Sequence, residues 1–195
     1  AVKERFGQKP WTEWEEDIRF RKDGAMDRCR KELHSGLEFQ EYLQYQFQKQ
    51  WMELKAYANS RGIRIIGDIP IYVAMDSADV WAEPRLFQLD EDNRPTAVAG
   101  CPPDGFSPDG QLWGNPLYNW EYHRKTGYQW WIKRLAWCYK LYDVVRIDHF
   151  RGFDEYYSIP AGAETAAGGH WEKGPGLPFF QAVTQALGHK EIIAE

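Results

Sequence analysis

The sequence predicts an α/β fold built around a parallel sheet. Helical and strand-like patterns alternate along the chain, and this order is typical of parallel sheets with helical connections. Three strand-like segments each run into an acidic residue, namely Asp68, Asp148 and Glu195. The 195 residues are 43% hydrophobic and 27% charged, which is the composition of a globular protein with a core. In such proteins the carboxyl ends of the strands carry the active site.

The overall composition disfavours several classes of function. A formal net charge of −5 offers no basic surface for nucleic acid, and no apolar run is long enough to span a membrane. The three cysteines are odd in number and widely spaced, without a metal-ligand pattern (Cys29, Cys101 and Cys138). We therefore expect reduced thiols and a cytoplasmic protein.

Aromatic residues make up 16% of the chain, and many fall in stretches rich in proline and glycine, where a packed core is not the obvious explanation. Flat rings with a polar tip suit partners that present C–H faces between hydroxyl groups, as sugars do.

Residues 1–62 are predicted to form an N-terminal helical segment. Apolar residues three and four apart predict a short amphipathic helix over 11–21. A capping-box pattern at 35–38 opens a long helix that ends near Arg61-Gly62. We expect the apolar and aromatic stripe of this helix to be core rather than a ligand site; it comprises Leu43, Phe47, Trp51, Leu54 and Ala58.

Residues 63–195 are predicted to contain three strands, at about 63–73, 143–150 and 191–195, with helices over about 126–142 and 179–187. Two segments show little periodicity and are expected to be loops, 83–121 and 154–178. The first is rich in proline, glycine and aromatic residues. It is too apolar for a solvated linker, so an ordered loop that covers a cleft is favoured.

The strand that ends at Asp148 shows how charge is placed at a sheet edge. Because side chains alternate along a strand, Arg146 and Asp148 point one way while Val145 and Ile147 point the other. One interpretation is a purely structural ion pair. Similarly, Asp68 lies next to glycine and proline, where an aspartate commonly stabilises a turn.

Three strands that end in acids favour a chemical interpretation instead. Glycosidic chemistry requires one ionised carboxylate and one protonated acid beside the scissile bond. The adjacent Arg146 would keep Asp148 ionised and suits it to the role of nucleophile. Glu195 has no cation beside it in sequence and is the better proton carrier. A divalent metal site is the rival interpretation, and Arg146 argues against it because it already neutralises the carboxylate.

Several stretches together resemble the 4-α-glucanotransferases of glycoside hydrolase family 77 (amylomaltases, or disproportionating enzymes), relatives of the α-amylases. The matching stretches are Gly67–Val73 (Gly-Asp-Ile-Pro-Ile-Tyr-Val), Asp76–Trp81, Pro102–Trp120 with its Gln-Leu-Trp-Gly-Asn-Pro-Leu-Tyr sequence, Arg146–Phe153 (Arg-Ile-Asp-His-Phe-Arg-Gly-Phe) and Ile192–Glu195.

The resemblance implies that the fold is part of a (β/α)8 barrel of the TIM type with a long insertion loop. It implies that Asp148 is the nucleophile, which forms a covalent glucosyl intermediate, and that Glu195 is the general acid/base. Asp68, Arg146 and His149 would hold the reacting glucose. The side chains near the sugar in the loop over the cleft would be Phe106, Gln111 and Trp113.

The implied reaction transfers an α-1,4-glucan segment to the 4-hydroxyl of another glucan or glucose with net retention. No metal and no organic cofactor is expected, and the partners are α-glucans and maltooligosaccharides. An α-1,4-glucan hydrolase of the α-amylase type and a non-catalytic glucan-binding module are the alternatives. The resemblance also implies a third catalytic carboxylate on a later strand. We therefore expect the 195-residue chain to be a fragment that is inactive alone and prone to self-association through open sheet edges.

Overall fold

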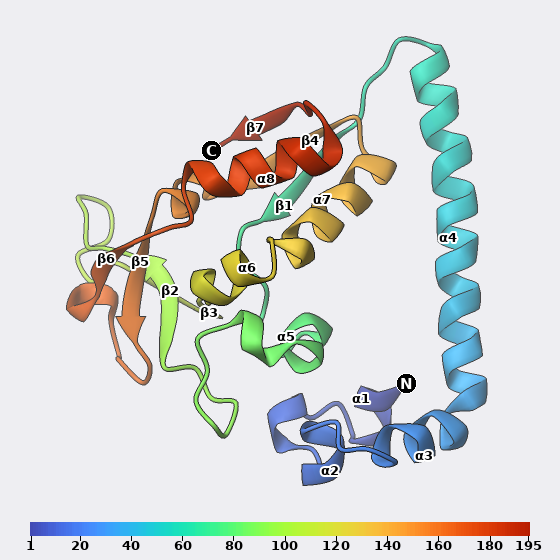
Figure 1. Ribbon diagram of the computed structural model, residues 1–195, viewed down its shortest axis with the longest axis horizontal. Helices are drawn as coiled ribbons and strands as arrows, with labels where there is room; N and C mark the ends of the chain where they lie inside the picture. The colour runs from blue at the N-terminus through green and yellow to red at the C-terminus, as the bar shows by residue number, and fades with distance from the viewer. The chain divides into compact units, whose positions relative to one another are not determined.

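The computed structural model describes residues 1–195, which form two compact units, unit 1 (Ala1–Ile63) and unit 2 (Arg64–Glu195) (Figure 1). Unit 1 is entirely helical. Its elements are α1 (Val2–Arg5), η1 (Trp11–Glu13), α2 (Glu16–Arg19), α3 (Ala25–Glu32) and α4 (His34–Ser60). No helix of the structure combines the length and the hydrophobicity that a membrane span requires.

The predicted helix over 11–21 is divided into two short helices, η1 and α2. The break falls at Trp14, whose backbone is extended (φ −73°, ψ 165°). The apolar residues that predicted the helix are nevertheless buried together, because Trp11, Trp14 and Ile18 are 2%, 8% and 3% exposed. The spacing thus identified the core of unit 1 but not the local backbone.

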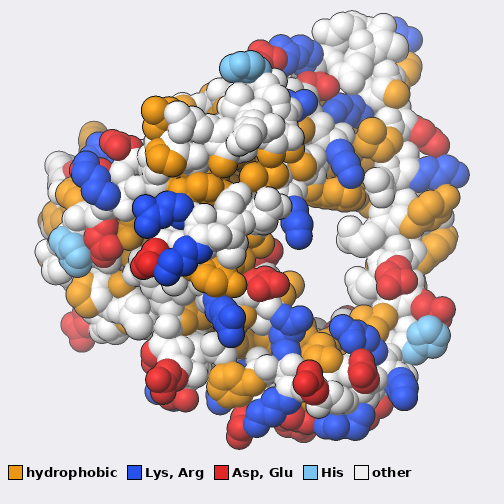
Figure 2. Space-filling view, in the orientation of Figure 1, with side chains coloured by type: hydrophobic (Ala, Val, Ile, Leu, Met, Phe, Trp, Pro, Cys, Tyr) orange, Lys and Arg blue, Asp and Glu red, His pale blue; other side chains and the backbone are white.

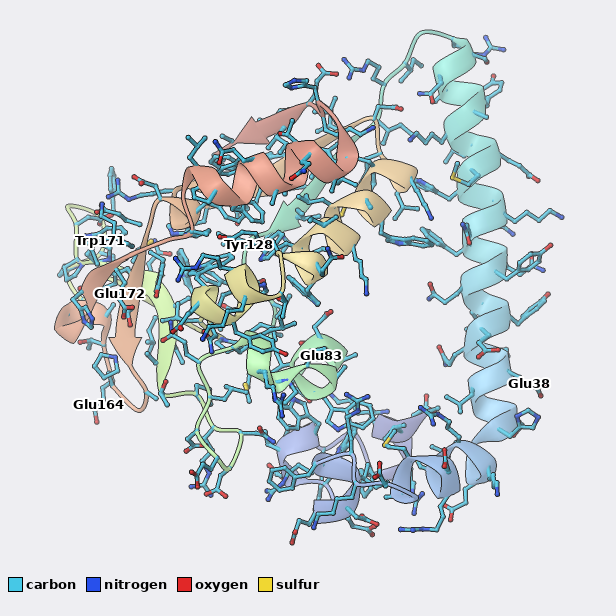
Figure 3. All side chains as sticks on the ribbon, viewed as in Figure 1. Glu38, Glu83, Tyr128, Glu164, Trp171 and Glu172 are labelled. Carbon is cyan, nitrogen blue, oxygen red and sulfur yellow. The ribbon has the colours of Figure 1, made fainter.

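The long helix α4 forms as predicted, but its apolar stripe is not core. Leu43, Phe47 and Leu54 are 42%, 49% and 54% exposed, so the prediction of burial is wrong. Side chains project from α4 along its whole length, and hydrophobic ones reach the surface in the space-filling view (Figures 2 and 3). Within unit 1, α3 packs against α4, and that contact leaves most of the helix uncovered.

Unit 2 contains the predicted parallel sheet. Its strands are β1 (Ile66–Pro70), β4 (Val144–Asp148) and β7 (Ile192–Ala194), in the order β1-β4-β7, and both pairings are parallel. Each strand is shorter than predicted. Gly67 brings β1 close to Tyr142, since an added Cβ would stand 2.0 Å from the ring of this tyrosine.

A second, antiparallel sheet was not predicted. It comprises β2 (Ala97–Cys101), β3 (Gln111–Pro116), β5 (Glu155–Pro160) and β6 (His170–Lys173) in the order β3-β2-β5-β6. The segments 83–121 and 154–178, expected to be loops, supply these strands. The strands are short, interrupted by glycine and proline, and paired with distant partners, so they carry little of the alternation by which strands are recognised.

Helices and an aromatic core support the parallel sheet. The helical elements of unit 2 are α5 (Ala78–Ala82), η2 (Pro84–Leu86), α6 (Trp120–Lys125), α7 (Gln129–Leu141), η3 (Phe150–Phe153), η4 (Ala166–Gly168) and α8 (Leu177–Leu187). Helix α7 packs against both β4 and α8. Trp131 of α7, Phe153 and Phe179 of α8 are almost fully buried against one another, and the last two rings stack 4.8 Å apart at 11°.

Candidate active site

The parallel pairing of β1 and β4 aligns the charged side chains of the two strands. Asp68 lies opposite Arg146, and Pro70 lies opposite Asp148. Val145 and Ile147 are fully buried, as the alternation of β4 predicts. Arg146 and Asp148 therefore occupy the other face, which is not covered by the helical layer.

The guanidinium of Arg146 contacts three carboxylates, one from each strand. Its Nη1 lies 2.5 Å from Oδ2 of Asp68, and its Nη2 lies 3.9 Å from Oδ1 of Asp148 and in close contact with Oε2 of Glu195. The three acidic side chains are 61%, 57% and 56% exposed, whereas that of Arg146 is 29% exposed. The cluster is thus an open one held by a partly buried cation.

These contacts bear on two sequence-based interpretations. The pair Arg146–Asp148 is not a buried structural ion pair, because Asp148 is mostly exposed and lies farthest from the guanidinium. Glu195 has no cation beside it in sequence, yet Arg146 contacts it directly across the sheet. The sequence neighbours of Glu195 do not reveal this contact, because residues 49 positions apart in sequence are neighbours in a parallel sheet. The role of Glu195 as the proton carrier stays a prediction.

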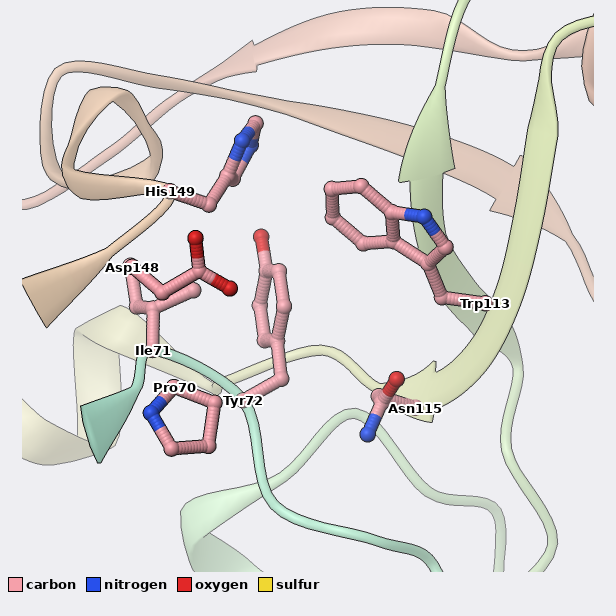
Figure 4. Close-up of a pocket in the computed structure, with 7 residues that line it drawn as sticks. All are labelled: Pro70, Ile71, Tyr72, Trp113, Asn115, Asp148 and His149. Carbon is pink, nitrogen blue, oxygen red and sulfur yellow. The ribbon is translucent and has the colours of Figure 1, made fainter. Parts of the chain in front are cut away.

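A pocket of about 360 Å³ lies beside this cluster at the carboxyl ends of β1 and β4. Figure 4 shows the carboxylate of Asp148, the rings of His149 and Tyr72, and the indole of Trp113 around one cavity. The complete lining is Pro70, Ile71, Tyr72, Trp113, Asn115, Asp148 and His149. Both sheets contribute, since Trp113 and Asn115 belong to β3.

His149 directly follows β4 in a left-handed conformation (φ 54°, ψ 45°), a backbone region that non-glycine residues seldom adopt. This turn directs its ring to the pocket, edge-on to Trp113 at 4.9 Å and 85°. Its Nε2 is buried and has no hydrogen-bond partner. Burial lowers the pKa of His149, with an opposing effect from Asp148, so the ring is a neutral group that can exchange a hydrogen bond with a ligand.

The segment that leaves β1 is fixed by two side chains from elsewhere in unit 2, Arg134 and Tyr118. Arg134 of α7 donates to the carbonyl oxygens of Pro70 (2.7 Å) and Ile71 (3.1 Å). The buried Tyr118 hydroxyl also donates to the carbonyl oxygen of Ile71 (2.7 Å). These bonds satisfy the carbonyl oxygens of Pro70 and Ile71 where β1 ends, and they hold the following Tyr72 in the wall of the pocket.

The sequence-predicted site residues fall into three groups. Asp148, His149 and Trp113 line the pocket, and Asp68, Arg146 and Glu195 join Asp148 in the charged cluster. Gln111 does not line the pocket but accepts a hydrogen bond from Trp113 Nε1 (2.9 Å). Phe106 is fully exposed and lies outside the pocket lining.

Sequence reasoning missed two polar side chains of the pocket, Tyr72 and Asn115. Both stand in stretches that carry the family resemblance, at Ile71-Tyr72 and Asn115-Pro116, so the motifs could have pointed to them. No group of three or more His, Cys, Asp and Glu side chains is arranged to hold a metal ion.

Acidic side chains at the carboxyl ends of parallel strands, beside an aromatic-lined pocket, are typical of α/β enzymes that act on carbohydrates. The chain belongs to the 4-alpha-glucanotransferase family, whose family model matches residues 1–195. The resemblance drawn from the sequence motifs is thereby confirmed.

Individual relatives agree with this assignment. A 4-alpha-glucanotransferase from Streptococcus pneumoniae is 55% identical over 196 residues, which cover 100% of this chain and 39% of that protein. One from Thermus thermophilus is 47% identical over 100% of this chain and 39% of its own length. The chloroplastic/amyloplastic 4-alpha-glucanotransferase of Solanum tuberosum is 43% identical over 95% of this chain and 32% of its own length. The chain therefore spans about two fifths of the length of the bacterial relatives.

A solved structure shares the fold closely. The amylomaltase from Streptococcus agalactiae in complex with acarbose superimposes with a TM-score of 0.96 at 49% identity, covering 100% of this chain and 40% of that one. The mixed α/β arrangement of this chain is thus that of part of an amylomaltase.

Proposed function

We propose that this chain contributes the nucleophile-bearing part of an active site that transfers α-1,4-glucan segments to the 4-hydroxyl of another glucan or glucose. The observation that carries the proposal is the cluster of Asp68, Asp148 and Glu195 around Arg146 beside an aromatic-lined pocket. Membership in the 4-alpha-glucanotransferase family supports it. The sheet β1-β4-β7 would be three neighbouring strands of a (β/α)8 barrel, which is the fold that the family resemblance implies.

In the proposed reaction, the carboxylate of Asp148 attacks the anomeric carbon of the donor glucan. The bond to the leaving 4-oxygen breaks as this oxygen takes a proton from Glu195, and a covalent glucosyl ester forms. In the second half, Glu195 takes the proton of the acceptor 4-hydroxyl, whose oxygen attacks the same carbon and releases Asp148. Two displacements at one carbon give net retention.

The other site residues would bind the sugar. Asp68 and Arg146 lie on the open face of the sheet next to Asp148, where they can bind hydroxyl groups of the reacting glucose. His149 offers its unpartnered Nε2, and Trp113 offers an apolar face. Gln111 would act by orienting the indole of Trp113, to which it is hydrogen-bonded. Phe106 stands at a turn fixed by Asp104 and would contact the glucan from the exposed side of the cleft.

Two further proposals concern the setting of the protein. The three free cysteines fit a reducing compartment such as the cytoplasm, whereas the relative from Solanum tuberosum is named as chloroplastic/amyloplastic. The strands β1 and β7 stand at the two edges of the three-stranded sheet, and these edges would favour self-association.

The test is a disproportionation assay with maltotriose, run on the chain and on a chimera in which residues 1–195 replace the matching segment of the Thermus thermophilus relative. We expect the chimera to form glucose and longer glucans. The substitution Asp148→Asn should abolish this turnover, while the matched surface substitution Asp92→Asn should not. Release of glucose without longer products would indicate a hydrolase, and full activity of the Asp148→Asn chimera would exclude the proposed nucleophile.

A further inference from the structure

One wall of the pocket is built by an irregularity in β3. Val98 of β2 pairs with Pro116, but Gly100 pairs with Leu112, so β3 contains extra residues between these two points. Gly114 lies within this bulge at φ 77°, a conformation that favours glycine. Trp113 and Asn115 flank it, and both line the pocket. Bulges re-aim side chains, and this one brings a polar group next to the indole.

The amide of Asn115 has one orientation that satisfies its neighbour. Its Nδ2 donates to the carbonyl oxygen of Val73 at 2.9 Å. A backbone carbonyl can only accept, so the amide nitrogen must face Val73 and Oδ1 must face away from it. Figure 4 shows the two amide atoms pointing in opposite directions, with the oxygen on the side of Trp113. This oxygen accepts no hydrogen bond from the protein.

A second polar atom of the same wall is also unpartnered. Tyr72 is 6% exposed, and its ring packs near those of Trp113, Tyr118 and His149. Its hydroxyl points into the pocket between Asp148 and Trp113 (Figure 4) and makes no hydrogen bond with the protein. Burial raises the pKa of Tyr72, so the hydroxyl keeps its proton and can donate.

An acceptor and a donor that are both held rigidly, and that both lack protein partners, are what binding of a polyhydroxyl ligand requires. Each sugar hydroxyl can donate to Asn115 Oδ1 or accept from the Tyr72 hydroxyl, while the Trp113 indole covers the apolar C–H face. Asn115 lies across the pocket from Asp148, and the Tyr72 hydroxyl lies between Asp148 and Trp113 (Figure 4), so the two groups can contact ligand hydroxyls both beside the carboxylate and on the side that faces Trp113.

We propose that Asn115 and Tyr72 form a hydroxyl-recognition pair that determines how strongly, and in which orientation, a glucose unit occupies this pocket. The proposal rests on the proposed function in requiring a glucan ligand. It assigns the pair a role in binding and in specificity rather than in bond cleavage. In this proposal the two ends of the Asn115 amide have different roles: Nδ2 makes the structural hydrogen bond to Val73, and Oδ1 contacts the ligand.

Titration calorimetry of the chain with methyl β-maltoside and with its monodeoxy analogues tests the pair. Asn115→Ala removes the acceptor, and Tyr72→Phe removes only a hydroxyl and keeps the packed ring. We expect each substitution to weaken binding of the maltoside by about 2- to 10-fold, the effect of one neutral hydrogen bond. For at least one monodeoxy analogue, the wild type should bind the analogue more weakly than it binds the maltoside. The variant that lacks the partner of the deleted hydroxyl should bind this analogue and the maltoside equally well.

The last comparison separates recognition from structure, because a purely structural role of Asn115 would weaken all analogues alike. A loss of affinity that is the same for all ligands in both variants, or no loss of affinity in either variant, would overturn the proposal that Asn115 and Tyr72 recognise hydroxyl groups. Should Asn115→Ala unfold, Tyr72→Phe carries the same test. Gln185→Ala, an exposed amide on α8, is the matched control and should bind as the wild type does. If the chain binds no maltoside, the same titrations are made with the chimera whose turnover is blocked by Asp148→Asn. Absence of binding there as well would overturn the proposed function together with the pair, whereas normal binding that neither variant affects overturns the pair alone.

Discussion

Nη1 of Arg146 lies 2.5 Å from Oδ2 of Asp68, and the parallel pairing of β1 and β4 places these two residues opposite each other. The same guanidinium also contacts Asp148 and Glu195. A single cation therefore fixes the relative positions of three acids that are far apart in the sequence. Because the acids are more than half exposed, their ion pairs contribute little to the free energy of unfolding.

The first prediction separates the effect of Arg146 on the positions of the acids from its effect on the free energy of unfolding. Arg146→Ala should lower the free energy of unfolding by about 1 kcal/mol or less. In the chimera it should reduce maltotriose turnover by at least about 100-fold, because three carboxylates without a shared cation repel one another and leave their positions. Arg146→Lys should restore only part of the activity, since one ammonium cannot replace the forked guanidinium. Urea unfolding and initial rates provide the two measurements. A loss of turnover that the loss of folded protein fully accounts for would show that Arg146 has only a structural role.

The second prediction concerns His123, which is fully buried among the rings of Tyr118, Trp120 and Trp130. Its Nε2 faces the carbonyl oxygen of Leu86 and therefore donates, while its Nδ1 has no partner. Burial lowers the pKa of His123 to about 4. The unfolded chain, with a histidine pKa of about 6.5, binds a proton first as the pH falls.

The stabilisation from the neutral His123 should thus be complete above about pH 6.5 and be lost as the pH falls from there toward 4. The full effect is about 3 kcal/mol. Urea unfolding at pH 7.5 and at pH 5 should show a smaller loss for His123→Gln than for the wild type. His189→Gln, an exposed histidine, serves as the control. A pH dependence that is identical in wild type and His123→Gln would contradict the assignment.

The third prediction concerns the hydrogen bonds that fix the exit of β1. Tyr118→Phe removes the buried hydroxyl that donates to Ile71 and should lower the free energy of unfolding by about 1 kcal/mol, because Arg134 still donates to the same oxygen. Arg134→Met should cost more, about 2–3 kcal/mol, since it frees the Pro70 carbonyl as well. Chemical denaturation measures both. Tyr45→Phe, on the exposed surface of α4, should be neutral, and the reverse order of the two losses would refute the argument.

The fourth prediction uses two glycines with different surroundings. At Gly67 an added Cβ would lie 2.0 Å from the Tyr142 ring, whereas at Gly105 it would meet nothing within 4 Å, and neither glycine has a positive φ. Gly67→Ala should lower the free energy of unfolding by about 1–3 kcal/mol through overpacking. Gly105→Ala should change it by about 0.5 kcal/mol at most. Thermal unfolding of the two variants gives the comparison, and similar midpoints for both would argue against a tight contact beneath β1.

Much of the parallel sheet could be predicted from the sequence because its signals are local. The β-branched run before Asp148 and the period-two alternation at Arg146 identified a strand with one buried and one polar face. The acids at the strand ends followed from the same pattern. The boundaries were less certain: β1 ends at Pro70, which pairs with Asp148, and the N–H of Ile71 still donates to the Asp148 carbonyl oxygen at 3.2 Å.

The remaining features depend on contacts that the local sequence does not encode. The strands β2 and β3 pair across a bulge, so neither shows a regular alternation. Asn115 is oriented by the Val73 carbonyl, 42 residues away, and Glu195 meets Arg146 only because the sheet order is β1-β4-β7. The exposed stripe of α4 illustrates the opposite error, in which a helical period was taken as proof of burial.

The alternation along β4 also limits how this part of the chain can change in length. Neighbouring residues of the strand point into different surroundings, with Val145 and Ile147 in the packed interior and Arg146 and Asp148 at the open face. Deleting or inserting one residue within Val144–Asp148 would exchange the two sets, burying two charges and exposing two aliphatic side chains. Substitutions can be accommodated one at a time at these positions, but indels cannot. In evolution, β4 should therefore keep a constant length even where the loops on either side of it grow or shrink.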